Sequence, residues 1–136
     1  MAEGILRHKV AEQGLDVRTD SAGTANYHVG ESPDHRAIAA MQRKGVDIRD
    51  LRARQFVAAD YNEFDLIFAM DQNNYSDMLS LASTEDDINK LRLILDLNGS
   101  DGMSVPDPYF GGDEGFNEVH QMLDRACDVL IDEIRG

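Results

Sequence analysis

The spacing of apolar residues predicts a helix at each end of the chain. Between Ala2 and Gln13, apolar side chains recur on one side, and Gly14 follows as a helix stop. The same spacing predicts a long helix from Asp113 to Arg135. Its apolar stripe consists of Phe116, Val119, Leu123, Cys127, Leu130 and Ile134. The first helix begins abruptly, because no capping side chain precedes it.

Start and stop signals predict three further helices. Ser32-Pro33-Asp34 opens one of them by the cap-then-proline rule, and Gly45 closes it. The other two are predicted from Asp71 to Leu81 and from Ser83 to Leu91. In the last of these helices, either Ser83 or Thr84 is expected to be the cap.

Three segments show strand patterns. Leu15 to Thr19 alternates between apolar and polar residues. Phe64 to Met70 is a near-continuous apolar run, as is typical of a strand buried on both faces of a parallel sheet, and Leu91 to Leu97 is the next strand. Because strands and helices alternate, we predict an α/β fold with a parallel sheet and right-handed crossovers.

The predicted sheet indicates where a ligand would bind. In open parallel sheets, ligand sites lie at the carboxyl ends of the strands. Three segments fall at those ends, namely Ser21 to Gly30, Met70 to Asn74 and the loop around Asp107. We therefore expect the three segments to form one site.

Composition narrows the class of protein. A chain of 136 residues with 42% hydrophobic and 29% charged residues is expected to form one soluble domain spanning residues 1–136. Its net charge of −13 argues against nucleic acid or an anionic membrane as a partner. No apolar run approaches the roughly 20 residues of a membrane span. The single cysteine excludes an internal disulfide and favours a cytoplasmic location, and the four histidines show no metal-ligand spacing.

The stretch "SVPDPYFGG" holds an aspartate between two prolines. Pro106 and Pro108 restrict their own backbone angles, and Pro108 also keeps Asp107 out of the helical region. Tyr109 and Phe110 follow directly. A carboxylate held in this way beside two aromatic rings indicates a group directed at a ligand. The alternative is a turn aspartate that bonds to its own backbone.

Five stretches resemble one family in content and in order. They are "DSAGT", "GESPDHRAIAAMQRKGVDI", "ARQF", "DLIFAMDQNN" and "VPDPYFGG". Together they cover essentially the whole chain and resemble the low-molecular-weight protein tyrosine phosphatases. The resemblance implies a single three-layer α/β domain, with a four-stranded parallel sheet and helices on both faces. It also implies hydrolysis of phosphotyrosine through a cysteinyl-phosphate intermediate, without a metal or an organic cofactor.

The resemblance assigns roles to the aspartate loop and to one earlier tyrosine. Asp107 matches the family's general acid, which protonates the leaving tyrosine oxygen. Tyr109 and Phe110 resemble one wall of the phosphotyrosine slot, and Tyr27 resembles the residue facing them. The alternative for these rings is simple packing of a loop onto the domain.

Other matched positions are expected to support the site. Ser21 matches a serine that braces the family's phosphate loop, although it could instead cap a backbone N–H in a turn. Arg54 matches a family arginine, but Leu51 stands where relatives often carry a histidine. Cys127 does not qualify as a nucleophile, because it is predicted on the apolar stripe of the last helix.

The family's nucleophile is the cysteine of a C-x-x-x-x-x-R-[ST] loop between the first strand and the first helix. The helix after that loop typically begins "SPMAEG", whereas this sequence begins "MAEG". We therefore expect the first strand, the catalytic cysteine and the phosphate-holding arginine to lie outside this sequence, and the chain as written to be inactive. A shortened product, omitted residues or a natural non-enzyme would each explain this, and we favour the first two.

A sheet without its first strand would leave N–H and C=O groups unpaired. A stable chain would then need a strand from rearrangement or from a second copy, as a homodimer or a strand-swapped oligomer. The expected ligands are phosphotyrosine-containing proteins, and phosphate or a similar anion where the loop is present. Two rival functions are a thiol-dependent arsenate reductase, which would need several cysteines, and a non-catalytic binding or oligomerising module.

Overall fold

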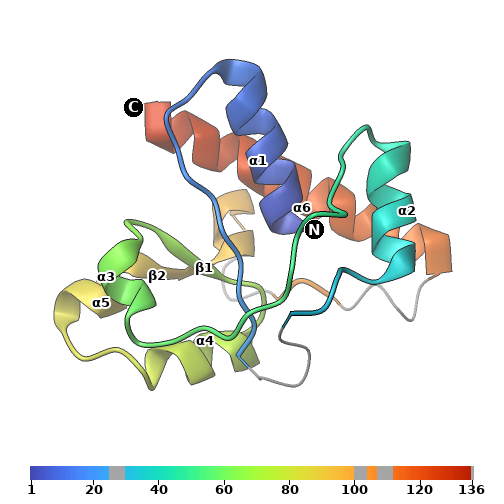
Figure 1. Cartoon of the computed structure of the whole chain (residues 1–136). Helices are drawn as coiled ribbons and strands as arrows, with labels where there is room; N and C mark the ends of the chain where they lie inside the picture. The colour runs from blue at the N-terminus through green and yellow to red at the C-terminus, as the bar shows by residue number, and fades with distance from the viewer. Residues whose placement is uncertain (25–29, 100–103, 107–111, 136) are drawn as a thin grey trace.

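A parallel pair of strands lies between two groups of helices (Figure 1). The computed structural model describes residues 1–24, 30–99, 104–106 and 112–135. In chain order the elements are α1 (Ala2–Gln13), α2 (His35–Arg43), α3 (Asp60–Glu63), β1 (Ile67–Ala69), α4 (Gln72–Leu79), α5 (Glu85–Lys90), β2 (Leu91–Leu93), the 3₁₀ helix η1 (Ile94–Asn98) and α6 (Gly112–Arg135). β1 pairs with β2 in parallel, with Ile67 opposite Leu91. The predicted α/β class with parallel strands is confirmed.

The side chains of β1 alternate between two apolar clusters. Phe68 packs against the cluster formed mainly by α1, η1 and α6. Ile67 and Ala69 belong to the other cluster, with Tyr61 and Met78 from the α3 and α4 side. The strands therefore form the middle of three layers, as the resemblance implies. Among the described residues no helix is long and apolar enough to cross a membrane.

The helix α1 has the bounds that the apolar spacing predicts. No side chain caps its start at Met1, and Gly14 ends it with φ 64°, a left-handed conformation that glycine adopts without strain. The helix α6 begins at Gly112, one residue before the predicted start. Its predicted stripe is buried except at Ile134, which is partly buried. Both predicted helices are confirmed. Their apolar faces meet in one cluster, which explains the apolar spacing of each.

The start of α2 differs from the prediction. The cap is Asp34, whose carboxylate accepts the backbone N–H of Arg36 at 2.8 Å, and the first helical residue is His35. Ser32 and Pro33 lie before the cap, so the cap-then-proline rule placed the start too early. An aspartate two residues before a free N–H of the first turn can satisfy that N–H directly.

The predicted helices after β1 exist but are shorter. α4 ends at Leu79 rather than Leu81, and α5 ends at Lys90. Thr84 is the cap of α5 and accepts the backbone N–H of Asp87 at 3.1 Å. The carboxylate of Asp87 accepts the backbone N–H of Ser83, the residue before the cap, at 2.9 Å, so both side chains satisfy backbone N–H groups at the start of the helix. The four-residue helix α3 was not predicted, because it is too short to show a periodicity.

The predicted strand from Leu15 to Thr19 is wrong as a strand. The segment is extended, and its side chains alternate between half-buried and exposed as predicted, but it forms no ladder with any other described segment. Among the described residues, the pairing in this region is a single parallel bridge between Gly23 and Gln55. Alternation therefore showed which side chains turn inward, but a strand also requires a hydrogen-bonding partner.

The two other predicted strands are each reduced to three residues. Phe64 to Met70 contributes only Ile67 to Ala69, and Leu66 is 42% exposed, so the run is not buried on both faces. Leu91 to Leu97 is a strand only as far as Leu93, after which the chain turns into η1. The tight turn of η1 carries its apolar residues into the cluster that α1, η1 and α6 form, which we call the α6 cluster. A straight strand would not do this. Within the described residues the sheet has two strands, whereas the resemblance implies four.

Candidate functional site

Three segments from distant parts of the chain meet at the carboxyl end of β1. The backbone N–H of Val105 donates to the carbonyl of Met70 at 2.7 Å. In the first turn of α4, the side-chain amide of Asn74 donates to the hydroxyl of Thr24 at 3.3 Å. The predicted convergence of these three segments is confirmed for their described residues.

The start of α4 holds this junction in place. Asp71 caps the helix by accepting the backbone N–H of Asn74 at 2.7 Å. The backbone N–H of Gln72 donates to the hydroxyl of Ser104 at 3.0 Å, which fixes the residues before the aspartate loop. One free N–H of the first helical turn therefore positions a neighbouring segment, and a second is satisfied by the cap of the helix itself.

Ser21 lies beside the first turn of α1. Its hydroxyl donates to the carboxylate of Glu3 at 2.5 Å, and its backbone N–H donates to Asp20 at 2.8 Å. In the structure the hydroxyl therefore links the predicted site segment to α1 instead of capping a backbone N–H. Its role as a brace for a phosphate loop stays a prediction.

Arg54 connects two segments of the site through carboxylates. Its guanidinium donates to Asp20 at 3.1 Å and to Asp60 at 3.0 Å. Asp60 is 6% exposed and also accepts the backbone N–H of Val57 at 2.8 Å. Partial burial opposes the charge of Arg54, but the hydrogen bond to Asp60 and the charge of Asp20 outweigh it, so the pKa of Arg54 is raised. Leu51 is partly buried and packs against the α6 cluster.

Four predicted site residues lie outside the described residues. They are Tyr27, Asp107, Tyr109 and Phe110. The described stretch 104–106 ends at Pro106, which directly follows Val105 and its hydrogen bond to Met70. The roles of these four residues therefore stay predictions.

Cys127 is a core residue, as its place on the stripe predicts. Its side chain is 1% exposed in the middle of α6. Burial disfavours the charged thiolate and raises the pKa of Cys127 to about 12. A thiol with this pKa is protonated at neutral pH and is a poor nucleophile.

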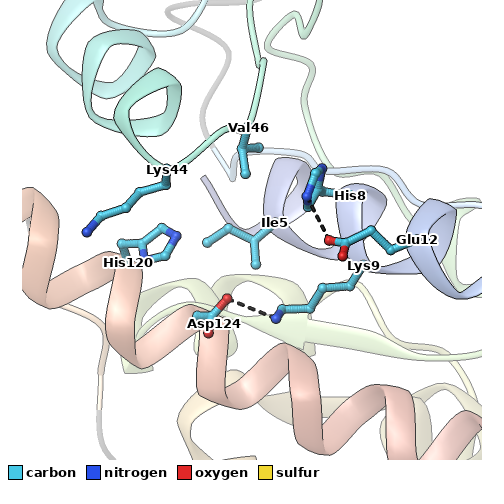
Figure 2. A pocket seen from close by; sticks show the side chains of 8 residues that line it. All are labelled: Ile5, His8, Lys9, Glu12, Lys44, Val46, His120 and Asp124. Carbon is cyan, nitrogen blue, oxygen red and sulfur yellow. Dashed lines mark ion pairs between the residues drawn. The ribbon is translucent and has the colours of Figure 1, made fainter.

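A pocket between α1 and α6 is lined by several charged side chains (Figure 2). Its volume is about 230 Å³. His8 pairs with Glu12 at 2.7 Å, and Lys9 pairs with Asp124 at 2.9 Å. Burial lowers the pKa of His120, which favours its neutral form. Within the described ranges no group of His, Cys, Asp and Glu is arranged to hold a metal ion.

Some residues of the junction were not singled out by the sequence. Thr24 and Asn74 fall inside two of the predicted segments, so the position of polar residues after a strand was the available signal. Asp60 had no comparable signal, because it lies in a helix that the periodicity did not reveal. Its role depends on contacts with residues distant from any motif.

Comparison with known proteins gives a consistent set of matches. The family model described as low molecular weight phosphotyrosine protein phosphatase matches residues 1–136. A putative low molecular weight protein-tyrosine-phosphatase of Synechocystis sp. is 41% identical, over 96% of this chain and 84% of the relative. The human low molecular weight phosphotyrosine protein phosphatase is 30% identical, over 98% of this chain and 85% of that protein.

Solved structures show the same similarity. A protein tyrosine phosphatase from Entamoeba histolytica, with Hepes in its active site, has a TM-score of 0.89 and 33% identity, covering 98% of this chain and 86% of that chain. A Drosophila arginine phosphatase also has a TM-score of 0.89, with 29% identity over 99% of this chain and 88% of that chain. The described α/β arrangement is therefore shared with experimentally determined relatives.

Proposed function

The chain belongs to the low-molecular-weight protein tyrosine phosphatase family, and we propose that its site hydrolyses phosphotyrosine esters. The observation that carries this proposal is the hydrogen bond between Val105 and Met70. It holds the start of the aspartate loop at the carboxyl end of β1, where Thr24 and Asn74 also meet. Ligand sites of parallel sheets lie at such ends.

The proposed reaction has two steps. A cysteine thiolate attacks phosphorus, the S–P bond forms, and the bond from phosphorus to the tyrosine oxygen breaks. Asp107 gives its proton to that oxygen, because a phenolate whose conjugate acid has a pKa of about 10 is a poor leaving group. The Asp107 carboxylate then takes a proton from water, which attacks phosphorus and releases phosphate and the thiolate.

The other site residues are proposed to bind and position. Tyr109 and Phe110 form one wall of the slot for the tyrosine ring, and Tyr27 faces them. Ser21 and Arg54 do not contact the substrate but position the segments that form the site. The hydrogen bonds of Ser21 to Glu3 and of Arg54 to Asp20 support this role. This reaction uses neither a metal nor an organic cofactor.

These 136 residues are proposed not to complete the reaction on their own. Their one cysteine is Cys127, whose raised pKa and burial exclude it as the attacking group. The family resemblance assigns the thiolate to a C-x-x-x-x-x-R-[ST] loop, which is not found within residues 1–136. An assay of the reaction therefore requires such a loop to be supplied.

The proposed partners are phosphotyrosine-containing proteins in the cytoplasm. One cysteine among 136 residues and a net charge of −13 support this location and this class of partner over nucleic acid. Phosphate or a similar anion would bind where the loop is present. A homodimer or a strand-swapped oligomer stays a prediction, and analytical ultracentrifugation of the 136-residue chain tests it.

A fusion tests the proposed function. Residues 1–136 are joined behind a synthetic segment that supplies a first strand and a C-x-x-x-x-x-R-[ST] loop, and the product is assayed with an aryl phosphate, with a phosphoarginine peptide, and with arsenate plus a thiol. We expect aryl phosphate hydrolysis that disappears when the loop cysteine becomes serine. Arsenate reduction without aryl phosphate hydrolysis, or a preference for phosphoarginine, would contradict the proposal.

A further inference from the structure

The pocket between α1 and α6, which we call the α1–α6 pocket, is formed by three separate segments (Figure 2). From α1 come Ile5 and three polar side chains, from α6 come His120 and Asp124, and from the segment after α2 come Lys44 and Val46. None of these residues belongs to the junction at the carboxyl end of β1. A ligand of this pocket would therefore occupy a different site from the one proposed for the phosphatase reaction.

The formal charges that line the α1–α6 pocket cancel, although the whole chain has a net charge of −13. Lys9 and Lys44 carry two positive charges, and Glu12 and Asp124 carry two negative ones. At physiological salt, exposed charges are largely screened beyond about 8 Å, so the nearby groups decide which ligand is attracted. The acidity of the chain as a whole therefore does not exclude a small anion from this pocket.

Both carboxylates of the pocket have partners, whereas one of its two ammonium groups does not. Glu12 pairs with His8 at 2.7 Å. Asp124 pairs with Lys9 at 2.9 Å. Lys44 is exposed, and no ion pair engages its side chain in the part of the chain that the structure describes. The charge that is left to attract a ligand is therefore positive and lies on Lys44.

The imidazole of His120 lies on the same side of the pocket as Lys44 (Figure 2). Burial is the main cause that lowers the pKa of His120. The charge of Asp124 raises this pKa, whereas the charges of Lys44 and Lys9 lower it further. At neutral pH the ring is therefore uncharged. An anion bound beside it would favour the imidazolium, because a nearby opposite charge stabilises the charged form.

The size and the walls of the pocket favour a small polar ligand. Its volume of about 230 Å³ is below the roughly 300–1,000 Å³ of pockets for drug-sized molecules. The apolar wall offers little surface to cover, because Ile5 is 2% and Val46 is 6% exposed. A lysine ammonium group is a common partner of phosphate oxygens, and a protonated imidazole donates a further hydrogen bond. A tetrahedral oxyanion fits both the volume and these donors.

We propose that the α1–α6 pocket binds a small oxyanion of the phosphate type between Lys44 and His120, and that His120 takes up a proton from solvent when the anion binds. Inorganic phosphate and the phosphate group of a small ester share this chemistry. Residues 1–136 contain no C-x-x-x-x-x-R-[ST] loop, so an oxyanion that this chain binds is not held by the family's catalytic loop. The proposal is therefore independent of the phosphatase reaction.

The test titrates the histidines of the 136-residue chain by nuclear magnetic resonance, in sulfate and in chloride of equal ionic strength. Sulfate is the probe because it keeps two negative charges while a histidine titrates. We expect sulfate to raise the pKa of His120 but not that of the exposed His35. Sulfate should also bind more tightly at pH 6 than at pH 8, by at most about tenfold per pH unit, because one proton is taken up. No rise at His120, or an equal rise at both histidines, would overturn the proposal.

Charge variants provide the matched control. Lys44→Gln is expected to weaken sulfate binding roughly threefold to fivefold at pH 6. In chloride alone it should raise the pKa of His120, because the charge of Lys44 lowers that pKa. Arg125→Gln removes a charge at an exposed position of α6 outside the pocket and should change neither quantity. If both variants weaken binding equally, sulfate responds to the overall charge of the chain and the proposal is wrong.

Two further ligands identify the source of the oxyanion. Inorganic phosphate and glycerol phosphate are titrated separately at pH 7, again with the signal of His120 as the readout. We expect a change that saturates, with half-saturation in the low millimolar range or below. Tighter binding of inorganic phosphate would identify the free ion as the ligand, and tighter binding of the ester would identify a small phosphate ester. A change that does not saturate with either ligand would overturn the proposal.

Discussion

The guanidinium of Arg54 lies 3.0 Å from the carboxylate of Asp60, which is almost completely buried. The same carboxylate accepts the backbone N–H of Val57, so one buried oxygen holds two groups. Arg54 also reaches Asp20 beside Ser21. Through these contacts, a helix that carries no family motif positions the segment that precedes the site.

Asp60→Asn tests this arrangement. The substitution keeps the size of the side chain but removes the charge that compensates Arg54. We expect the free energy of unfolding to fall by about 2 kcal/mol, because a buried charge-assisted hydrogen bond becomes a weaker neutral one. Urea denaturation measures the change. The exposed pair of Arg7 and Asp50 is the control, and Asp50→Asn should cost clearly less. Equal losses would show that burial of Asp60 is unimportant.

Asp107→Asn tests the proposed general acid in the fusion protein that contains the cysteine loop. It keeps the shape of the side chain and removes the transferable proton. We expect kcat to fall about 10²-fold for phenyl phosphate, and far less for an ester whose leaving group needs no proton. Steady-state kinetics with both substrates provides the measurement. Asp113→Asn, a nearby change of the same type, should leave both rates unchanged.

The leaving-group comparison separates two roles for Asp107. An equal loss on good and poor leaving groups would show that the side chain holds the loop and does not act as the acid. In the 136-residue chain without an added loop, Asp107→Asn is expected to change no rate, because its one cysteine is Cys127.

Asp34→Ala and Ser32→Ala distinguish the observed cap of α2 from the one expected from sequence. Removing Asp34 leaves the backbone N–H of Arg36 without its acceptor, so we expect the melting temperature to fall by roughly 3–5 °C. Ser32→Ala should have little effect, because α2 begins at His35 with Asp34 as its cap. Thermal unfolding followed by circular dichroism checks both. A larger loss for Ser32→Ala would show that the cap has been misassigned.

The contribution of Asp34 should depend on pH. The backbone N–H of Arg36 lowers the pKa of Asp34, so the folded chain holds this carboxylate ionised at a pH where the unfolded chain begins to protonate it. The stabilisation is therefore fully present above about pH 4 and declines as the pH falls further. The difference in melting temperature between the parent and Asp34→Ala should shrink over that range.

Cys127 provides a test of burial in α6. Because it is the only cysteine, a thiol reagent reports on this position alone. We expect the folded chain to react very slowly at pH 8 and the urea-unfolded chain to react fully, because burial raises the pKa of the thiol to about 12. In the unfolded chain the thiol of Cys127 loses its proton near pH 9, whereas in the folded chain it keeps the proton up to about pH 12. This contribution to stability is therefore lost as the pH rises from about 9 to 12. Rapid reaction of the folded chain would contradict the assignment.

Local signals along the chain were sufficient to identify several elements. The 3.6-residue spacing of α1 and α6 identified both helices, because each needs only one apolar face and its own backbone hydrogen bonds. Thr84 was among the expected caps, since a cap acts within one turn. The order of strands and helices also predicted that segments near Thr24, Asn74 and Val105 would meet.

Other features depend on partners that lie far apart in the chain and could not be predicted from local signals. Residues 15–19 have the alternation of a strand, but no other segment in the described part of the chain forms a ladder with them. Residues 94–98 form η1 because α6 receives their apolar side chains. Asp60 acquires its role only when Arg54 reaches it. Periodicity shows which side of a segment turns inward, whereas hydrogen-bonding partners and burial arise only when separate segments pack together.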